Sequence, residues 1–590
     1  MMRWVLTAAL LAGLGMPVAA QSGTTPVPQD IEILWGQKIP MRDGVRLNAT
    51  VYRVRGQTVP LPVIFTLTPY ISDTYHRFAM RAARDGYVFA AVDVRGRGNS
   101  EGRFEPFVNE GKDGHDIVEW MARQPWSNGK TAMWGGSYGG TDQWATVKEM
   151  PPHLTTIVPV APAYVGHDFP FEGNIFNTYV IQWLTYTSGA TAQSSIFGDM
   201  AHWASVARTL HRNHLPFRVL DSLAGNKSTM FQRWLEHPAP DAYWDGVAPT
   251  PEQYRKITQP ILTITGHYDG DQLGTLMHYR NFLKHATPEA RKGIFMVMGP
   301  WDHGGTRVPT RNVNGIEFGD NSMVDIAQLH KEWYDWTMKD GPRPSFLKKP
   351  VAYYVAGSDV WKYADSLEAI ANETRRYYLH SINGRANDVF ASGTLSTAAP
   401  VASAPDRWVY NPLDTVPYME SATNPWAMSF VDPTPVHQTG GNGLIYHSEP
   451  FEEETEVAGQ IKFTAWLSMD VPDTDLWVTL YEVLPDGQTR QLTSSLLRAR
   501  YRESLRQEKL VTPGAVLPYR FENFPFFARR FTKGSRLRLF IRSPNTIALQ
   551  KNYNGGGVVA NESGKEARTA RIALHHDPKY PSVLEIPITR

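Results

Sequence analysis

Short apolar runs alternate with helical stretches through much of the first half of this chain, and that rhythm restricts its possible folds more than any other feature. Residues 62–67 and 87–93 are predicted to be buried strands with a helix between them. The alternation resumes after residue 250, with strands predicted over residues 260–265 and 293–298. Because such repeats pack helices onto a sheet through right-handed crossovers, we expect the α/β class with a parallel sheet.

Two regions depart from this rhythm. Residues 151–250 are rich in aromatic side chains and helical in pattern over 179–187 and 200–211, which is typical of an insertion packed over a sheet. Beyond Pro350, helical periodicity nearly vanishes and short β-rich runs lie between turns, which indicates a sandwich or jelly roll. The predicted organisation is an α/β domain of residues 21–150 and 251–350, a helical cap of residues 151–250, and a β-rich domain of residues 351–590.

The composition excludes several classes of partner and chemistry. The 590 residues include 59 Lys and Arg against 58 Asp and Glu, so no field of one sign would steer the chain to nucleic acid or an anionic membrane. We expect neither partner, whereas a homo-oligomer stays open. Cysteine is absent, which excludes disulfides, thiolate nucleophiles and cysteine-ligated metals.

The first 20 residues have the pattern of an export signal. An arginine near the start precedes an uncharged, mostly apolar run over residues 4–16, and small residues stand at Val18 and Ala20. The apolar run is shorter than the about 20 residues that span a bilayer, which favours a cleaved signal peptide over a retained anchor helix. We expect cleavage between Ala20 and Gln21 and a periplasmic or secreted mature protein.

The pattern Gly-x-Ser-x-Gly occurs twice, and its context separates the two copies. Residues 135–139 follow a predicted strand over 130–134 and lead into a predicted helix over 141–150. A sharp turn between strand and helix presents a serine hydroxyl above a parallel sheet, so Ser137 is the candidate nucleophile. The second copy, centred on Ser100, follows a strand but precedes no helix. Ser100 is therefore interpreted as a structural loop residue.

A serine nucleophile requires a base, and the base must be oriented by an acid. After a strand–turn–helix nucleophile these partners follow in the order acid, histidine, each behind a later strand. Asp269 and His303 meet this condition and would lie at the carboxyl edge of the sheet, where open α/β sheets hold their sites. They are the predicted partners of Ser137. Asp271 and Asp302 are alternative acids, and a hydrogen-bonded loop histidine is the alternative interpretation of His303.

In these motifs the chain resembles the cocaine esterase-like and X-Pro dipeptidyl-peptidase-like serine hydrolases, a group that includes α-amino acid ester hydrolases and glutaryl cephalosporin acylases. The resemblance covers nearly the whole mature chain, and it is specific for the family rather than for a substrate. It implies an α/β-hydrolase core, an inserted helical cap and a C-terminal jelly roll. It is carried by residues 68–70, 93–102, 119–129, 135–139, 266–269, 299–303, 472–475, 483–487 and 497–502.

The resemblance also implies an oxyanion hole made of a backbone N–H and a tyrosine hydroxyl. The N–H is that of Tyr138, directly after the nucleophile, and the hydroxyl is that of Tyr70. Tyr70 ends a predicted strand, from which its phenol could reach over the sheet edge. Two donors aimed at the developing alkoxide contribute about 3 kcal/mol each. The alternative is that Tyr70 is a packed aromatic residue.

Relatives that act on α-amino acid esters hold the substrate ammonium between carboxylates, one from the cap and two that follow the triad acid at the second and third positions. Here the second position is Asp271, but the third is the uncharged Gln272. Asp168 matches the cap position, with Glu172 as a weaker substitute. Two carboxylates would attract an ammonium less strongly than three. Alternatively, Asp168 caps a helix and Asp271 is a loop acid.

The expected function is that of a serine hydrolase that cleaves small-molecule esters or amides through an acyl-enzyme. α-Amino acid esters or β-lactam side-chain acyl groups are the first expectation for the substrate, and X-Pro dipeptides are the second. The alternative from another class is a carbohydrate-binding protein on a catalytically dead core. Because no His-Glu-x-x-His motif and no nucleotide loop occur, we expect no metal and no cofactor.

Overall fold

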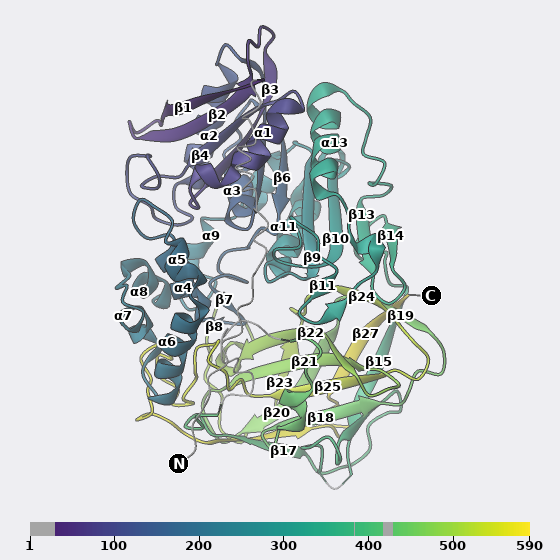
Figure 1. The fold of residues 1–590 in the computed structure, drawn as a ribbon. Coiled ribbons are helices and arrows are strands. Elements are labelled where there is room, and N and C mark those ends of the chain that lie inside the picture. The colour runs from purple at the N-terminus through teal and green to yellow at the C-terminus, as the bar shows by residue number, and fades with distance from the viewer. Residues whose placement is uncertain (1–29, 383, 417–428, 590) are drawn as a thin grey trace, which may run out of the picture.

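The computed structural model describes residues 30–382, 384–416 and 429–589, which form an α/β core, a helical cap and a β-rich C-terminal domain (Figure 1). The core sheet has the strand order β1-β2-β4-β3-β5-β6-β9-β10-β13-β14, and all pairs from β4 to β13 are parallel. Its strands are β1 (Ile31–Pro40), β2 (Arg46–Val54), β3 (Leu61–Thr68), β4 (Val88–Asp93), β5 (Ser127–Gly136), β6 (Leu154–Val160), β9 (Ile261–Tyr268), β10 (Ile294–Asp302), β13 (Val351–Val355) and β14 (Val360–Ala364).

Helices cover both faces of this sheet, as strands buried on both sides require. One hydrophobic core lies between the sheet and α2, α3 and α11, and a second lies between the sheet and α1 and α13. The predicted α/β class is confirmed. The helices are α1 (His76–Arg84), α2 (Glu110–Ala122), α3 (Tyr138–Val147), α10 (Pro251–Lys256), α11 (Gln272–His285), α12 (Pro288–Arg291) and α13 (Ile326–Lys339).

The core sheet extends past two of the predicted domain boundaries. Strand β6 pairs with β5 and β9, so residues 154–160 belong to the core and not to the cap. Strands β13 and β14 extend the same sheet, so the core runs to Ala364 rather than to residue 350. In both places a proline marks the end of one element, and the next strand returns to the sheet before the domain ends.

The cap packs around aromatic side chains. Trp183, Trp203, Phe231 and Trp234 are all buried in one cluster, which explains the aromatic composition of this segment. Figure 1 shows the cap helices beside the C-terminal domain and below the first strands of the core. The elements are β7 (Phe171–Glu172), β8 (Ile175–Phe176), α4 (Tyr179–Tyr186), α5 (Ser194–Gly198), α6 (Met200–Arg212), α7 (Leu220–Leu223), α8 (Thr229–Leu235) and α9 (Ala242–Asp245).

The C-terminal domain is all-β, with almost entirely antiparallel pairing and its own hydrophobic core, as predicted. Strand β20 buries every second residue, which is the pattern of a sheet with one face packed on a core. The strands are β15 (Glu373–His380), β16 (Gly393–Ser396), β17 (Asp406–Tyr410), β18 (Gly443–Ser448), β19 (Thr455–Gly459), β20 (Lys462–Met469), β21 (Asp475–Val483), β22 (Thr489–Arg498), β23 (Leu517–Phe521), β24 (Phe527–Phe531), β25 (Arg536–Arg542), β26 (Ala570–His575) and β27 (Val583–Thr589).

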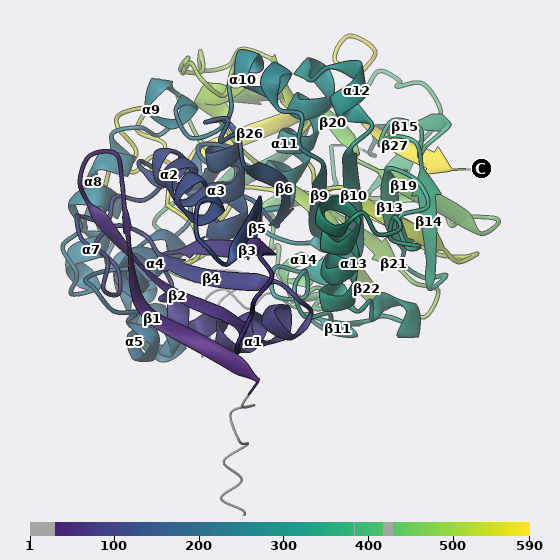
Figure 2. The same cartoon turned by 90° about the horizontal axis from the view of Figure 1, so that it is seen from above.

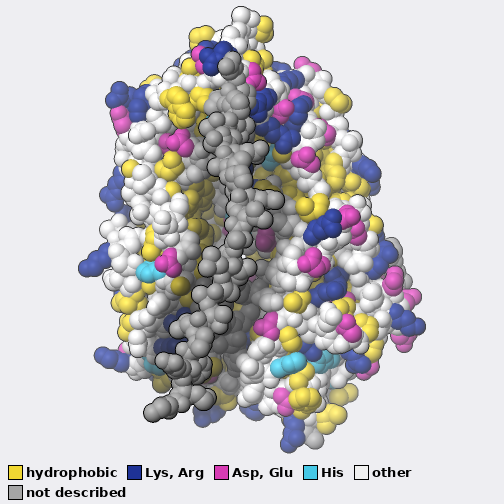
Figure 3. Space-filling model, viewed as in Figure 1, with side chains coloured by type: hydrophobic (Ala, Val, Ile, Leu, Met, Phe, Trp, Pro, Cys, Tyr) yellow, Lys and Arg dark blue, Asp and Glu magenta, His cyan; other side chains and the backbone are white. Residues whose placement is uncertain are grey.

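The C-terminal domain contacts both the core and the cap. The Ala356 amide donates to the Ala528 carbonyl at 2.9 Å, and the Arg498 amide donates to the Gly173 carbonyl at 3.0 Å. Figure 2, a view from above, shows the core sheet and its helices in front of the C-terminal strands. On the face drawn in Figure 3, acidic and basic side chains are interspersed. Within the described ranges, no helix has the length and apolar character needed to span a bilayer.

Candidate active site

Ser137 occupies a sharp turn between β5 and α3. Its backbone has φ 60° and ψ −123°, which is strained for a residue with a side chain. Hydrogen bonds hold the turn, because the Ser137 amide donates to the Val160 carbonyl at 2.9 Å and its carbonyl accepts from the Gly140 amide at 2.8 Å. Ser137 lines a cavity of about 430 Å³. The turn therefore presents Ser137 at the sheet edge, in the setting expected of a nucleophile.

Gln143 braces this turn, although no motif in the sequence marks it. The side-chain nitrogen contacts the carbonyls of Gly135, Gly139 and Val158, each at 3.0 Å. The side-chain oxygen accepts from the Val158 amide at 2.7 Å. The sequence offers one signal of this role, a glutamine on the buried face of a predicted helix. A buried amide must find hydrogen-bond partners, so such a residue is expected to brace its surroundings.

Asp269 and His303 meet at the carboxyl ends of β9 and β10, which pair in parallel register. His303 Nδ1 donates to Asp269 Oδ1 at 2.7 Å. The other oxygen of Asp269 accepts from the Thr265 hydroxyl at 2.8 Å, and Oδ1 also accepts from the Asp271 amide at 3.1 Å. With Nδ1 donating to the carboxylate, Nε2 is left as the proton acceptor.

The two alternative acids have other surroundings. Asp271 Oδ2 lies 3.8 Å from His303 Nδ1, which is too far for the hydrogen bond that Asp269 makes. Asp302 accepts from the Gly305 amide at 2.8 Å within its own turn. The geometry therefore favours Asp269 as the acid that orients His303.

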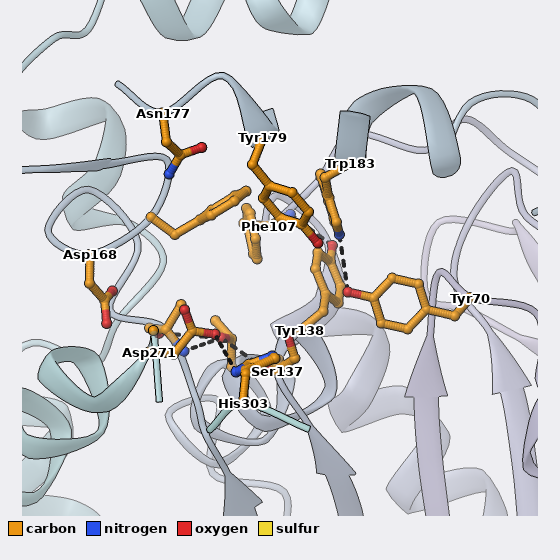
Figure 4. Close-up of a pocket in the computed structure, with 14 residues that line it drawn as sticks. Tyr70, Phe107, Ser137, Tyr138, Asp168, Asn177, Tyr179, Trp183, Asp271 and His303 are labelled. Atoms are coloured by element: carbon orange, nitrogen blue, oxygen red, sulfur yellow. Dashed lines mark hydrogen bonds and ion pairs between the residues drawn. The ribbon is translucent and has the colours of Figure 1, made fainter. Parts of the chain in front are cut away.

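The charges of this group support a base and its acid. Burial raises the pKa of Asp269, but the charge of His303 and the hydrogen bonds from His303 and Thr265 outweigh burial and hold it below its ordinary value. Burial lowers the pKa of His303, but the carboxylates of Asp271 and Asp269 outweigh burial and raise it. Ser137 and His303 line the same cavity (Figure 4). They share no direct hydrogen bond within the described residues, and such bonds often tighten only when substrate binds.

Tyr70 points its phenol into the cavity from the segment after β3. Its hydroxyl oxygen accepts from Trp183 Nε1 of the cap at 3.1 Å, which leaves the phenol proton for another acceptor. Its ring stacks on Tyr186, with centroids 5.6 Å apart. Burial raises the pKa of Tyr70, and the nearby Ser137 hydroxyl opposes that shift. Tyr70 is thus a neutral donor beside the nucleophile, as an oxyanion hole needs.

Trp183 is a site residue that the sequence analysis does not identify. It lies on α4, more than 100 positions from Tyr70, in a cluster that contains many other buried aromatic residues. Its indole N–H is the only donor of that side chain, and the structure directs it at the Tyr70 hydroxyl (Figure 4). Nothing in the sequence distinguishes this tryptophan from its buried neighbours.

Tyr138 has separate tasks for its backbone and its side chain. It is the first residue of α3, where a backbone N–H has no acceptor within the helix and remains available to a substrate oxygen. Its phenol donates to Glu110 of α2 and accepts from the Phe107 amide at 3.0 Å. Burial raises the pKa of Glu110 to about 7. These anchors fix the side chain and so hold the backbone N–H beside Ser137.

Asp168 and Asp271 border the cavity that holds Ser137 (Figure 4). One oxygen of Asp168 accepts from the Tyr164 amide at 2.8 Å and the other accepts from the Gly274 amide in the first turn of α11. Asp168 is therefore a helix cap as well as a wall of the cavity. Burial and the charge of Asp271 raise the pKa of Asp168 well above its usual range. Burial raises the pKa of Asp271 to about 6, although the charge of His303 opposes it.

The other two residues considered for an amine site lie elsewhere. Gln272 is buried, donates to the carbonyls of Gly266 and Phe526 at 2.8 Å each, and accepts from the Phe526 amide at 2.6 Å. This side chain therefore ties the core to the C-terminal domain and does not line the cavity. Glu172 lines a second cavity, and burial raises its pKa to about 7.

Ser100 has the loop role that its context predicts. Its hydroxyl donates to the Asp93 carbonyl at 2.7 Å and accepts from the Asn48 amide at 2.8 Å. The hydroxyl thus uses its proton and one lone pair to hold this loop to β4 and β2. Ser100 does not line the cavity that contains Ser137.

A strained serine at a strand–helix turn, with a histidine–aspartate pair from later strand ends, defines the class of α/β-hydrolase serine hydrolases. Residues 43–305 match the X-Pro dipeptidyl-peptidase (S15 family), and residues 345–585 match the X-Pro dipeptidyl-peptidase C-terminal non-catalytic domain. The chain belongs to this family, which also contains the CocE/NonD hydrolases, and the protein is a serine hydrolase that acts on esters or amides.

Known relatives and structures match nearly end to end. A cocaine esterase from Rhodococcus sp. (strain MB1 Bresler) is 27% identical over 580 residues, covering 94% of this chain and 98% of the relative. An aminopeptidase from a marine sediment Thaumarchaeota archaeon superposes with TM-score 0.81 and 23% identity, over 95% of this chain and 97% of that one. An α-amino acid ester hydrolase superposes with TM-score 0.81 and 20% identity, over 97% of this chain and 100% of that one. At these identities the structures establish the shared fold.

Proposed function

We propose that the protein hydrolyses esters or amides whose acyl group carries a free α-amine, above all α-amino acid esters or the side-chain acyl groups of β-lactams. One observation carries the proposal. The carboxylates of Asp168 and Asp271 border the same cavity as Ser137 and His303 (Figure 4). An α-ammonium lies one carbon from the scissile carbonyl, so an acid beside the nucleophile is well placed to bind it.

The proposed reaction gives each of these side chains one role. His303 removes the proton of Ser137 as the serine oxygen attacks the carbonyl carbon, and Asp269 holds the imidazole in the correct tautomer. The oxyanion accepts hydrogen bonds from the Tyr70 hydroxyl and the Tyr138 backbone N–H. His303 then gives its proton to the leaving group, which departs and leaves an acyl-Ser137 ester. Water, activated by His303, attacks that ester and releases the acid and the free serine.

The two acids proposed to hold the amine differ in how strongly their surroundings oppose ionisation. Burial raises the pKa of Asp271 to about 6 and that of Asp168 well above its ordinary range, so proximity and desolvation disfavour two negative charges there. A bound ammonium reverses this, because an opposite charge within a few ångströms favours both carboxylates. A bound ammonium therefore favours ionisation of Asp168 beside Asp271, which is already largely ionised at neutral pH.

The test compares esters that differ only in the α-amine, such as phenylglycine methyl ester and phenylacetic acid methyl ester, within a panel of aryl esters, cephalosporins and Xaa-Pro amides. We expect kcat/KM to favour the amino ester. The preference should rise with pH through about 6, because Asp271 is protonated and neutral below its pKa. The ratio of the two kcat/KM values is free of the effect of His303 titration, because that titration changes the hydrolysis of both esters alike. A ratio near one at all pH values would contradict amine recognition and leave a general esterase.

Export is part of the proposal, supported by the predicted signal peptide of residues 1–20, which lie outside the described residues. The chain secreted or recovered from a periplasm should begin at or near Gln21, which N-terminal sequencing would show. An intact Met1 on a membrane-bound form would contradict cleavage and make the segment an anchor.

A further inference from the structure

Arg307 lies across the backbone of the nucleophile turn. A Cβ atom built on Gly136 would be 2.8 Å from Arg307 Nη1 and 2.9 Å from its Cδ, so this glycine leaves the space that the arginine side chain occupies. Real Cβ atoms do not approach other atoms so closely, and any larger residue at position 136 would displace the guanidinium. The positive charge is therefore held one residue from Ser137.

The same short turn carries Arg307 and His303. The Arg307 amide donates to the Gly304 carbonyl at 3.1 Å, and the Thr306 hydroxyl donates to the His303 carbonyl at 2.8 Å. The base and the guanidinium are thus fixed relative to each other. Because His303 protonates the leaving group, the leaving-group half of the substrate must lie on the His303 side of Ser137.

Within the ranges that the structure describes, no acid forms an ion pair with Arg307, although its charge reaches Asp271 and opposes the rise in the pKa of that carboxyl. Arg307 is half-buried, and among the described residues the only hydrogen bond of its guanidinium is a 3.3 Å contact from Nη1 to Thr306 Oγ1. Arg95, by comparison, makes ion pairs of 2.6 Å with both Asp43 and Asp113. A guanidinium presents a fork of donors that matches a carboxylate, so an unoccupied one beside a nucleophile is suited to bind an anionic group.

Arg307 does not line the cavity that holds Asp168 and Asp271, so it lies outside the part of the site assigned to the acyl group. We propose that Arg307 binds a carboxylate on the leaving group, such as that of an amino acid, a peptide C-terminus or a β-lactam nucleus. The inference rests on the proposed function, because it takes Ser137 as the nucleophile and the acidic cavity as the acyl site. It adds a charge requirement on the other half of the substrate.

Four esters separate this proposal from amine recognition. The acyl group is phenylglycyl or phenylacetyl, and the leaving group is lactate, with its carboxylate, or the neutral lactamide. The ratio of kcat/KM between phenylglycyl and phenylacetyl esters measures recognition of the amine, and the ratio between lactate and lactamide esters measures recognition of the carboxylate. A ratio near one for either comparison contradicts only the proposal that it tests, so the two proposals can be refuted independently.

We expect the wild-type enzyme to prefer lactate esters and Arg307→Gln to lower the lactate-to-lactamide ratio about tenfold, on the scale of a partly solvated charge-assisted hydrogen bond. Arg307→Lys, which keeps the charge, should retain part of the preference. Added salt should lower the wild-type ratio because it screens an accessible pair. A wild-type ratio near one at low salt, or an equal loss on both esters in Arg307→Gln, would overturn the proposal. Should Arg307→Gln fail to fold, the salt series and Arg307→Lys still decide the question.

Discussion

The carboxyl edge of the core sheet and the helical cap contribute to one cavity, but each holds its residues by a different means. At the sheet edge, backbone geometry positions Ser137, Asp269 and His303, because each directly follows a strand whose register is fixed by its neighbours. In the cap, side-chain packing positions Trp183 and Asp168 through partners distant in the chain. The comparison indicates that backbone geometry places the reacting groups at the sheet edge, while the acids proposed to bind the amine come from both regions, Asp168 from the cap and Asp271 from the sheet edge.

The largest effect should come from the sheet edge. Ser137→Ala removes the nucleophile and should lower kcat on the order of 10⁴-fold or more, with the fold intact because alanine is smaller than serine. A fluorophosphonate probe with mass spectrometry of the labelled peptide gives an independent measurement. The label should attach to Ser137 in the wild-type enzyme and to nothing in the variant. Labelling at Ser100, or retention of a tenth of the activity, would remove Ser137 from its role, and no labelling at all would favour a catalytically dead binding protein.

The second effect concerns the donor that both regions share. Tyr70→Phe removes the hydroxyl proton aimed at the oxyanion and should lower kcat about 10²–10³-fold with little change in KM. Tyr75→Phe is a matched control, because the Tyr75 hydroxyl lies 3.1 Å from Thr68 Oγ1 rather than in the lining of the cavity. A rise in KM alone for Tyr70→Phe would show that Tyr70 contacts substrate and that the second donor lies elsewhere.

A third prediction concerns the missing acid. Gln272→Glu introduces the third carboxylate of the amine-binding pattern, but the side chain is buried against the carbonyls of Gly266 and Phe526. A carboxylate cannot donate to those oxygens, so the variant should lose about 1–3 kcal/mol of unfolding free energy and gain no affinity for the amine. Denaturant unfolding and the amino-ester KM measure the two effects. A stable variant with a lower KM would show that position 272 can face the cavity.

The smallest effect should come from the cap. Trp183→Phe keeps an aromatic ring but removes the N–H that holds the Tyr70 hydroxyl at 3.1 Å. Because the bond acts through Tyr70, we expect a loss of about tenfold in kcat, on the scale of one hydrogen bond. In the Tyr70→Phe background the same substitution should have almost no further effect on kcat. Additive losses in the double variant would show that Trp183 acts independently of Tyr70.

The sequence was informative where position along the chain determines position in space. Ser137, Asp269 and His303 are recognisable because each directly follows an apolar run that reads as a strand, and parallel strands end at one edge. Strand β6 was misassigned because the prolines before it end a helix and resemble a domain boundary. The partnerships of Trp183 with Tyr70 and of Gln272 with Phe526 join residues 113 and 254 positions apart. No local pattern encodes such pairs, since they arise only when separate units pack.

The most direct test of the proposed amine recognition is the effect of Asp271→Asn on two esters that differ only in the α-amine. The substitution keeps the shape of the side chain and removes its charge. We predict that KM for phenylglycine methyl ester rises about tenfold, while kcat is largely retained and phenylacetic acid methyl ester is affected far less. Equal losses on both esters would contradict the account, because Asp271 would then serve the reaction at the sheet edge rather than the choice of acyl group.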